Sequence, residues 1–253
     1  MKKYDVIIIG TGAGGGTLAR KLADSNLQIL LLERGNFLPK EIENWNPHEV
    51  YTVGRYRPKE MWMDKDGNDF APFTHYCVGG NTKVYGAALL RLRETDFQAV
   101  KHQDGISPAW DLSYEELEPW YVEAERLYHA HGTRGIDPTE PFASADYPFP
   151  AMQPEPDMAE LFAHLEMLGH RPAPIPIGIR LPEDFRKRTD AAMPSYFDGY
   201  PDPTDMKADS HVVGVKPALE TGNVDLLTGM TVQKLLTDPS GKRVTKVVAT
   251  HDG

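Results

Sequence analysis

The residues of this chain best suited to chemistry lie near its start, in the run Gly10-Thr11-Gly12-Ala13-Gly14-Gly15. This is a G-x-G-x-x-G pattern, which alone is a weak signal. Here it follows an apolar run, Val6–Ile9, and precedes a helical pattern at Thr17–Ala23. A second apolar run, Leu27–Leu32, ends at an acidic residue, Glu33. This context predicts a strand-turn-helix-strand unit that binds a dinucleotide.

Each of these residues meets a specific physical need of such a site. Gly10 permits a tight turn, Gly12 lets the backbone approach a pyrophosphate, and Gly15 lets the helix pack closely on the strand. The phosphates then lie at the positive end of the helix. Glu33 can accept hydrogen bonds from both ribose hydroxyls of an adenosine, and it would repel a 2′-phosphate, which disfavours NADP. The alternative, a glycine-rich turn without a ligand, has no use for both the glycines and the carboxylate.

A second segment with chemical potential is Cys77-Val78-Gly79-Gly80-Asn81-Thr82-Lys83-Val84-Tyr85-Gly86. Paired glycines followed by small polar side chains allow the backbone to approach a flat, polar ligand closely. An isoalloxazine ring is such a ligand. Judged from these residues alone, a flavin-binding segment and a plain loop are equally good interpretations.

The elements that must position these segments are expected on either side of a proline-rich stretch. Of the 21 prolines, 13 lie between Pro138 and Pro203, which predicts loops, turns and extended chain there. Ser210–Leu219 has valines that favour a strand and a spacing that also permits a helix. The other expected elements are a helical region at Ser113–His131 that Pro119 kinks or divides, a helix that opens at Asp157 and ends before Gly169, and strands at Val224–Leu227, Thr231–Leu236 and Arg243–His251.

Composition excludes several classes of protein. The chain of 253 residues is 40% hydrophobic and 25% charged, which are globular values and exclude collagen, coiled coils and wholesale disorder. Its net charge of −10 argues against binding to nucleic acid or to an anionic membrane. No apolar run approaches the length of a membrane span, and Asp5 interrupts the run that most resembles a signal peptide. A single cysteine, Cys77, permits no internal disulfide, so we expect a cytoplasmic protein.

Together these segments resemble the GMC (glucose–methanol–choline) oxidoreductases, a family of flavoproteins. Tyr4–Gly16 is similar to the family's FAD fingerprint. Gly79–Gly86, with Arg91, is similar to its second glycine motif, which lies along the flavin. Asn223–Gly229, followed by Val232, resembles a strand pair whose backbone meets the adenine. The resemblance covers essentially the whole chain.

The resemblance implies that the cofactor is FAD. Some members attach FAD through a histidine at the position of Val84, and valine cannot form that bond, so FAD is expected to be held non-covalently. Many members have Asn where Tyr85 stands, so this flavin contact is not carried over. The residues expected to contact FAD are Gly10, Gly12, Ala13, Gly14, Gly15, Glu33, Arg34, Gly79, Gly80, Asn81, Thr82, Val84, Gly86 and Val232.

The implied fold is α/β: a Rossmann-like FAD-binding domain of the three-layer ββα type, with irregular proline-rich insertions and incomplete relative to the family. Its core would comprise residues 1–35, 75–100 and 205–253, with insertions at 36–74 and 101–204. Members of the family continue with a substrate-binding sheet and a catalytic histidine. We therefore expect the C-terminal substrate domain to be absent, and no catalytic residue is assigned.

The implied activity is oxidation of a CH–OH group in an alcohol or a sugar-like polyol, with hydride transfer to flavin N5. This chain would supply the FAD site. Its partners would be a small-molecule substrate and a missing C-terminal half or partner chain. Two alternatives stay open: a non-catalytic FAD-binding half or split subunit, and another FAD fold such as a monooxygenase. The resemblance also favours a helix for Ser210–Leu219.

The histidines and the cysteine are weaker candidates for chemistry. His129 and His131 lack a third ligand at a metal-like spacing, so no metal site is expected. His75 is expected to be a buried, hydrogen-bonded side chain and Cys77 a small packed one. If the catalytic residue lay within this chain, His75 and His211 would be the first positions to test.

Overall fold

The computed structural model describes residues 3–181 and 197–251. The chain divides into two compact units, one formed by Met1–Tyr85 with Ser195–Gly253 and the other by Gly86–Pro194. Both glycine-rich segments belong to the first unit as far as Tyr85. The boundaries expected for the core and the insertions of an FAD-binding domain stay a prediction.

A parallel sheet forms the centre of the first unit. Its strands are β1 (Val6–Ile9), β2 (Ile29–Leu32) and β10 (Val224–Leu227), in the order β1-β2-β10. The central strand β2 pairs in parallel with both neighbours, and all four of its residues are buried. A continuously apolar strand is what this central position requires.

Helices cover one face of this sheet. α1 (Ala13–Ala23) connects β1 to β2 and packs against a π-helical segment, His211–Val215, which runs directly into α5 (Lys216–Glu220). The strand-turn-helix-strand unit and the helical interpretation of Ser210–Leu219 are therefore confirmed. The core between sheet and helices contains Ile8, Ala19, Ala23, Ile29, Leu31, Val78, Val215, Ala218 and Val224.

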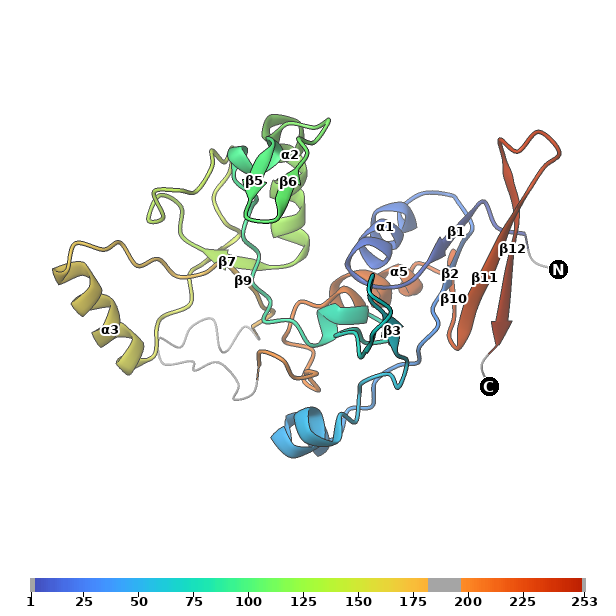
Figure 1. Cartoon of the computed structure of the whole chain (residues 1–253), viewed down its shortest axis with the longest axis horizontal. Helices are drawn as coiled ribbons and strands as arrows, with labels where there is room; N and C mark the ends of the chain where they lie inside the picture. The colour runs from blue at the N-terminus through green and yellow to red at the C-terminus, as the bar shows by residue number, and fades with distance from the viewer. Residues whose placement is uncertain (1–2, 182–196, 252–253) are drawn as a thin grey trace. The chain divides into compact units, whose positions relative to one another are not determined.

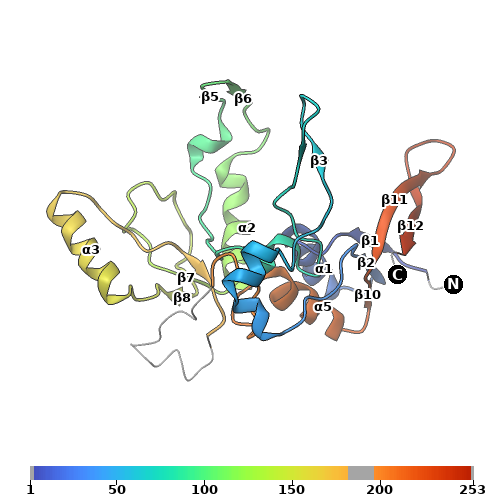
Figure 2. The same ribbon diagram turned by 60° about the horizontal axis from the view of Figure 1, so that its bottom comes forward.

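An antiparallel hairpin forms the third layer of the first unit. Its strands are β11 (Met230–Thr237) and β12 (Val244–His251), close to the ranges expected from the sequence. Figure 1 and Figure 2 both show the parallel sheet between this hairpin and the helices α1 and α5. This is the Rossmann-like, three-layer arrangement that the resemblance predicts.

The rest of the first unit consists of short elements. Residues 36–74 contain a 3₁₀ turn at Ile42–Trp45, a π-helical segment at His48–Val53 and a small hairpin of β3 (Trp62–Met63) and β4 (Asp69–Phe70). The second glycine segment forms a 3₁₀ turn at Gly80–Lys83. Sequence periodicity gave no signal for these elements because each is shorter than two helical turns or a standard strand.

The second unit is built around one helix, α2 (Tyr114–Leu127), and a small mixed sheet. A second helix, α3 (Pro156–Met167), has no buried residue. The remaining elements are a 3₁₀ turn at Glu94–Phe97, a hairpin of β5 (Val100–His102) and β6 (Gly105–Ser107), and a sheet with the order β8 (Phe149–Pro150), β7 (Ala130–Gly132), β9 (Ile177–Gly178).

The structure corrects the expected end and interruption of α2. The predicted capping box is present, because the Ser113 hydroxyl accepts from the N–H of Glu116 while that glutamate accepts from the N–H of Ser113. Pro119 does not divide the helix, which continues through it with one backbone N–H missing. It ends at Leu127, not at 131, because the next residues join a sheet as β7.

The start of α3 also differs from the expected capping box. Its N-cap residue is Glu155, and Pro156 occupies the first helical turn, a position where its lack of an N–H costs nothing. Asp157 lies inside the helix as an acidic residue of the first turn. The predicted end is confirmed, since Gly169 follows the cap with φ +84°.

Candidate cofactor site

Three glycines shape the turn between β1 and α1. Gly10 has φ +87°, a left-handed conformation that glycine adopts without strain, and its N–H donates to the carbonyl of Leu32 at 2.7 Å. A Cβ on Gly15 would lie 2.0 Å from the carbonyl oxygen of Gly10, so only glycine lets α1 pack this close to β1. Gly12 is the N-cap residue of α1 and provides no capping side chain. A helix N-terminus of this kind attracts anions.

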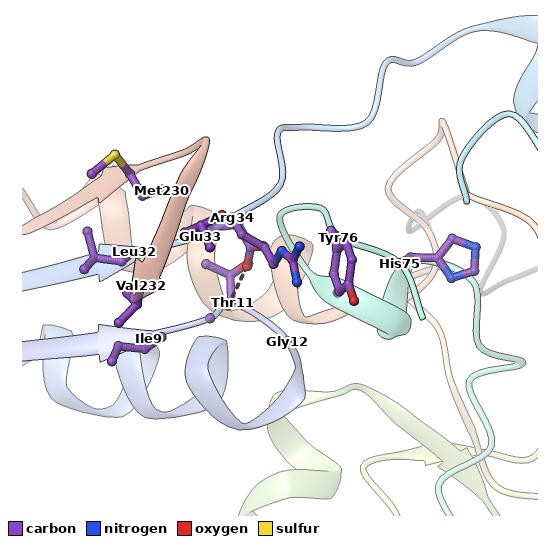
Figure 3. A pocket seen from close by; sticks show the side chains of 13 residues that line it. Ile9, Thr11, Gly12, Leu32, Glu33, Arg34, His75, Tyr76, Met230 and Val232 are labelled. Atoms are coloured by element: carbon purple, nitrogen blue, oxygen red, sulfur yellow. Dashed lines mark hydrogen bonds between the residues drawn. The ribbon is translucent and has the colours of Figure 1, made fainter. Parts of the chain in front are cut away.

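A cavity of about 330 Å³ lies at this end of the parallel sheet, and Figure 3 shows the side chains around it. We refer to it as the nucleotide cavity. It lies at the carboxyl ends of β1 and β2, which is where open α/β sheets bind their ligands. Its lining residues are Ile9, Gly10, Thr11, Gly12, Leu32, Glu33, Arg34, His75, Tyr76, Gly80, Met230, Thr231 and Val232.

Glu33 is tied to the glycine turn by hydrogen bonds. Its Oε2 accepts from the backbone N–H of Thr11 at 2.9 Å and from the Thr11 hydroxyl at 2.6 Å, the contact drawn in Figure 3. Its Oε1 accepts from the N–H of Gly35 at 2.9 Å. Glu33 is buried yet lines the nucleotide cavity, so this carboxylate both orders the turn and faces the ligand space.

The same threonine connects the two glycine segments. The hydroxyl of Thr11 accepts from the N–H of Gly79 at 3.1 Å. The hydroxyl of Ser210, just before the π-helical segment, lies 2.9 and 2.8 Å from the carbonyl oxygens of Thr11 and Gly12. The Ser210 N–H donates to the hydroxyl of Thr82 at 2.9 Å. Three segments far apart in the sequence are thus held at one point beside the cavity.

Arg34 and Tyr76 form one wall of the nucleotide cavity. The guanidinium carbon of Arg34 lies 3.6 Å from the centroid of the Tyr76 ring, which is a cation–π contact, and Figure 3 shows the two side chains facing each other. The guanidinium also pairs with Glu60 at 3.1 Å. A Cβ on Gly35 would lie 2.0 Å from the Tyr76 carbonyl oxygen, so a glycine at position 35 permits this close approach.

A second cavity of about 300 Å³ lies in the same unit, and we call it the distal cavity. The Asn81 side chain ties its wall together, because Oδ1 accepts from the N–H of His75 at 2.7 Å and Nδ2 donates to the carbonyl of Phe73 at 3.3 Å. Arg57 packs over the Phe73 ring with its guanidinium carbon 4.4 Å from the centroid. The lining residues are Val50, Tyr51, Arg57, Phe73, His75, Asn81, Val84, Tyr85, Asp198 and Gly199.

His75 lines both cavities. Its side chain is buried, as expected, and burial lowers its pKa, so the neutral imidazole is favoured. The expected hydrogen bond is not made at Nδ1, which is buried and has no partner within residues 3–181 and 197–251. An unsatisfied buried ring nitrogen between two cavities is a group that a polar ligand could satisfy.

The structure distributes the predicted cofactor residues among three positions. Gly10, Gly12, Glu33, Arg34, Gly80 and Val232 line the nucleotide cavity, and Asn81 and Val84 line the distal cavity. Ala13, Gly14 and Gly15 lie in the first turn of α1. Gly79, Thr82 and Gly86 line neither of the two cavities. The assignment of all fourteen residues as cofactor contacts stays a prediction.

Several lining residues were not found by the sequence analysis. Thr11 occupies a variable position of the glycine pattern, so the motif carries no information about it. Tyr51, Arg57 and Phe73 come from the segment interpreted as an insertion, and Asp198 comes from the proline-rich stretch. No local sequence pattern identifies these residues, because irregular chain segments bring them to the cavity.

The weaker candidates have structural partners instead. Cys77 is buried, and burial raises the pKa of its thiol to about 12, so it is a packed residue as expected. His129 and His131 stack on the ring of Phe149, with centroids 5.7 and 4.9 Å away. The ring of His211 meets that of Phe37 edge to face at 5.2 Å. Within the described residues, no three His, Cys, Asp or Glu side chains gather as a metal site.

Arg91, named with the second glycine motif, lies in the second unit and is buried among ion pairs. Its Nε and Nη2 donate to the two carboxylate oxygens of Glu125 at 2.7 and 2.9 Å. Its Nη1 donates to the Tyr114 hydroxyl at 2.8 Å and to Glu118 at 3.2 Å. This two-bond pairing of a guanidinium with a carboxylate anchors α2.

In the described part of the chain, no helix is both long and apolar enough to cross a membrane.

Comparison with known proteins gives the following relatives. The chain is 31% identical over 244 residues to 6‴-hydroxyparomomycin C oxidase of Streptomyces lividus, and 28% identical over 185 residues to paromamine 6′-oxidase of Streptomyces fradiae. It is 26% identical over 131 residues to an uncharacterised GMC-type oxidoreductase of Sinorhizobium fredii. These matches cover 94%, 70% and 52% of this chain. No protein-family model matches it.

The chain is shorter than these relatives and than the solved structures that it resembles. The three matches cover only 43%, 31% and 25% of the relatives' own lengths. An FAD-dependent oxidoreductase from Chaetomium thermophilum superposes with a TM-score of 0.61 at 16% identity, over 99% of this chain and 42% of that one. The shared fold is therefore that of part of a longer architecture.

Proposed function

Because the chain belongs to the GMC oxidoreductase family, of which it spans the N-terminal, FAD-binding part, we propose that it binds FAD and serves the oxidation of CH–OH groups. The observation that carries this proposal is the nucleotide cavity. It brings a helix N-terminus, a carboxylate and the start of β11 to one space. The parts of a dinucleotide need these three environments.

The residues of the nucleotide cavity fit the adenosine diphosphate half of FAD. Gly12 and Gly80 present backbone without side chains, which suits an approaching pyrophosphate. Three of the four acceptor sites of the Glu33 carboxylate are used within the chain, which leaves one on Oε1 for a ribose hydroxyl. Met230 and Val232 offer apolar surface at the start of β11, where the adenine would lie.

The distal cavity fits the flavin half. It is lined by Asn81 and Val84 of the second glycine segment, and it shares His75 with the nucleotide cavity. One elongated ligand can therefore contact both cavities, and the unsatisfied Nδ1 of His75 lies where its middle would pass. Bound FAD would supply a hydride acceptor for substrate oxidation. We assign the chain's residues to binding and orientation, and no catalytic base is assigned.

We propose a sugar-like alcohol as the substrate class, because two of the relatives are oxidases whose names refer to paromomycin-type compounds. Activity would require further polypeptide, supplied by a C-terminal half or a partner chain. The edge strand β1 supports this need, since Ile7 and Ile9 are 39% and 50% exposed. Apolar strands of parallel sheets are normally covered on both faces and paired. We also propose a cytoplasmic location, which is supported by a single cysteine that is free and buried.

The proposal is tested by reconstitution. The purified chain should take up FAD, and acid precipitation should release all of the flavin, because Val84 has no nucleophilic atom. Flavin that stays in the pellet would contradict the non-covalent site and implicate His75 or Cys77. An open reading frame that continues or adjoins codon 253 should be joined to the chain and assayed for alcohol-dependent flavin reduction. Reduction only in the joined form supports an enzyme half, and no reduction in either form supports a non-catalytic half.

A further inference from the structure

Lys207 is a buried cation that no step of the proposed function uses. Its side chain is completely inaccessible to solvent. Its Nζ donates to the carbonyl oxygens of Phe197 at 2.6 Å and Tyr200 at 2.8 Å, and more weakly to that of Lys83 at 3.4 Å. It also lies 4.8 Å from the centroid of the Phe197 ring. A lysine is almost never fully buried without a specific set of partners.

The carbonyls that Lys207 binds belong to the two segments that wall the distal cavity. One segment contains Lys83 and continues into Val84 and Tyr85, and the other spans residues 197–200 and contributes Asp198 and Gly199. The N–H of Gly199 donates to the carbonyl of Val84 at 2.9 Å. The Lys207 ammonium group therefore bonds both segments and links them to each other.

The hydrogen-bond count of this site matches a protonated lysine. An ammonium group has three donors, and three carbonyl oxygens surround it. A neutral amine has two donors and turns a lone pair toward the third carbonyl. Replacement by an apolar side chain would leave all three buried carbonyls without this donor, which is costly.

The charged groups that face Lys207 are the carboxylates of Asp198, Asp202 and Asp209 and the ammonium group of Lys83. Lys83 is itself paired with Asp209 at 2.7 Å. Burial outweighs the carboxylates and lowers the pKa of Lys207 to about 8. The ammonium form is therefore the main one at pH 7, and the amine form becomes the main one above pH 8.

We propose that Lys207 is the positioning residue of the distal cavity: its buried ammonium group fixes the Lys83–Tyr85 and 197–200 segments in the arrangement that accepts the flavin half of the cofactor. This inference rests on the proposed function for its ligand. The nucleotide cavity shares no lining residue with the Lys207 site, so the adenosine half should bind independently of it.

The test compares two ligands on the whole chain. FAD is titrated by flavin fluorescence and ADP by calorimetry, for the unchanged chain and for Lys207→Met. The expected result is that Lys207→Met raises the Kd of FAD about tenfold or more and changes that of ADP by less than about twofold. The matched control is Lys216→Met, a lysine that is 54% exposed in its side chain and should change neither Kd. Equal weakening of FAD and ADP, or no change in FAD, would overturn the proposal.

A pH series on the unchanged chain gives a second readout that needs no variant. The FAD affinity should fall between pH 8 and 9 while the ADP affinity stays constant. Titration of Lys207 does not lower the free energy of unfolding in this window. A lysine whose folded pKa lies below its unfolded value raises the free energy of unfolding as pH rises through that window. A flat FAD profile, or parallel ADP and FAD profiles, would contradict the role of the ammonium group.

Hydrogen exchange separates a failure of this inference from a failure of the FAD assignment. In the ligand-free chain, the amide of Gly199 should exchange faster in Lys207→Met than in Lys216→Met, because its acceptor Val84 is no longer held. Unchanged exchange at Gly199 overturns the positioning role whatever the chain binds. Faster exchange in a chain that binds no FAD supports the positioning role and overturns the proposed function.

Discussion

Thr11 and Glu33 are joined by two hydrogen bonds, since the backbone N–H and the hydroxyl of Thr11 both donate to Oε2 of Glu33, at 2.9 and 2.6 Å. The carboxylate that ends β2 thus shapes the turn that ends β1. The Thr11 hydroxyl also accepts from the N–H of Gly79, which brings the second glycine segment to the same place. The acidic residue of this dinucleotide motif is therefore a structural group as well as a ligand-facing one.

We expect Thr11→Val to weaken FAD binding by about 1–2 kcal/mol, because the variant keeps the volume of the side chain but removes a buried hydroxyl with two partners. The loss should appear in the Kd of FAD and in that of ADP, since both ligands need the glycine turn. The matched control is Thr52→Val, an exposed threonine in the π-helical segment His48–Val53. Unchanged affinities in Thr11→Val would show that the hydroxyl bridge has no role in the site.

Two neighbouring glycines of α1 should respond oppositely to alanine. Gly15→Ala places a Cβ 2.0 Å from the carbonyl oxygen of Gly10 and should destabilise the chain by about 1–3 kcal/mol or more. Gly14→Ala meets no atom within 4 Å and should stabilise the helix by about 0.5–1 kcal/mol. Thermal unfolding of the ligand-free chain measures both effects. A higher melting temperature for Gly15→Ala would mean that α1 does not pack on β1 as the structure has it.

The fold could be predicted from the sequence where the signal is local. The apolar runs and the glycine spacing predicted β1, α1 and β2. The acidic residue that follows β2 predicted that the ligand cavity lies at the carboxyl ends of these strands. The end of α2 could not be predicted, because its last turn is decided by the pairing of Ala130–Gly132 with distant strands. Periodicity describes one segment at a time and contains no information about such partners.

The residues of the candidate site could likewise be predicted only where a local sequence pattern identifies them. The glycines and Glu33 follow from a motif with a steric rationale, and six of the predicted residues do line the nucleotide cavity. Asp198 lies in the proline-rich stretch and Lys207 follows it, and tertiary contacts set the path of this part of the chain, so no local pattern marks either residue. Their roles depend on which carbonyl groups the fold brings together, and a sequence does not show this.

Cys77 should resist thiol reagents in the folded chain. Burial raises the pKa of its thiol to about 12, so almost none of the reactive thiolate exists at pH 8. Because Cys77 is the single cysteine, alkylation by iodoacetamide reports on this side chain alone. The expected rate is at least about a hundredfold slower in buffer than in guanidinium chloride, where the thiol has its ordinary pKa of about 8.5. Equal rates would show that the segment before Gly79 is open.

Arg91→Ala should strongly destabilise the second unit. Removing this guanidinium leaves two buried carboxylates, Glu118 and Glu125, without their ion pair to Arg91. Deleting one partner of a buried ion pair lowers the free energy of unfolding by about 3–5 kcal/mol. The control is Arg93→Ala, whose pair with Asp137 at 2.6 Å is partly exposed and should contribute less than about 1 kcal/mol. Urea unfolding measures the difference. Similar losses for the two variants would contradict the buried ion-pair network.

The most direct measurement of the central claim is equilibrium binding of FAD, ADP, NAD and NADP to the purified chain. We predict that FAD binds with one site per chain and that ADP competes with it. NAD, which has the same adenosine diphosphate half but no isoalloxazine, should compete more weakly than FAD binds, and NADP, whose 2′-phosphate Glu33 would repel, should displace neither. ADP must compete because the nucleotide cavity around Gly12 and Glu33 receives the half of FAD that the two ligands share. Binding of NAD or NADP without uptake of FAD would contradict the account.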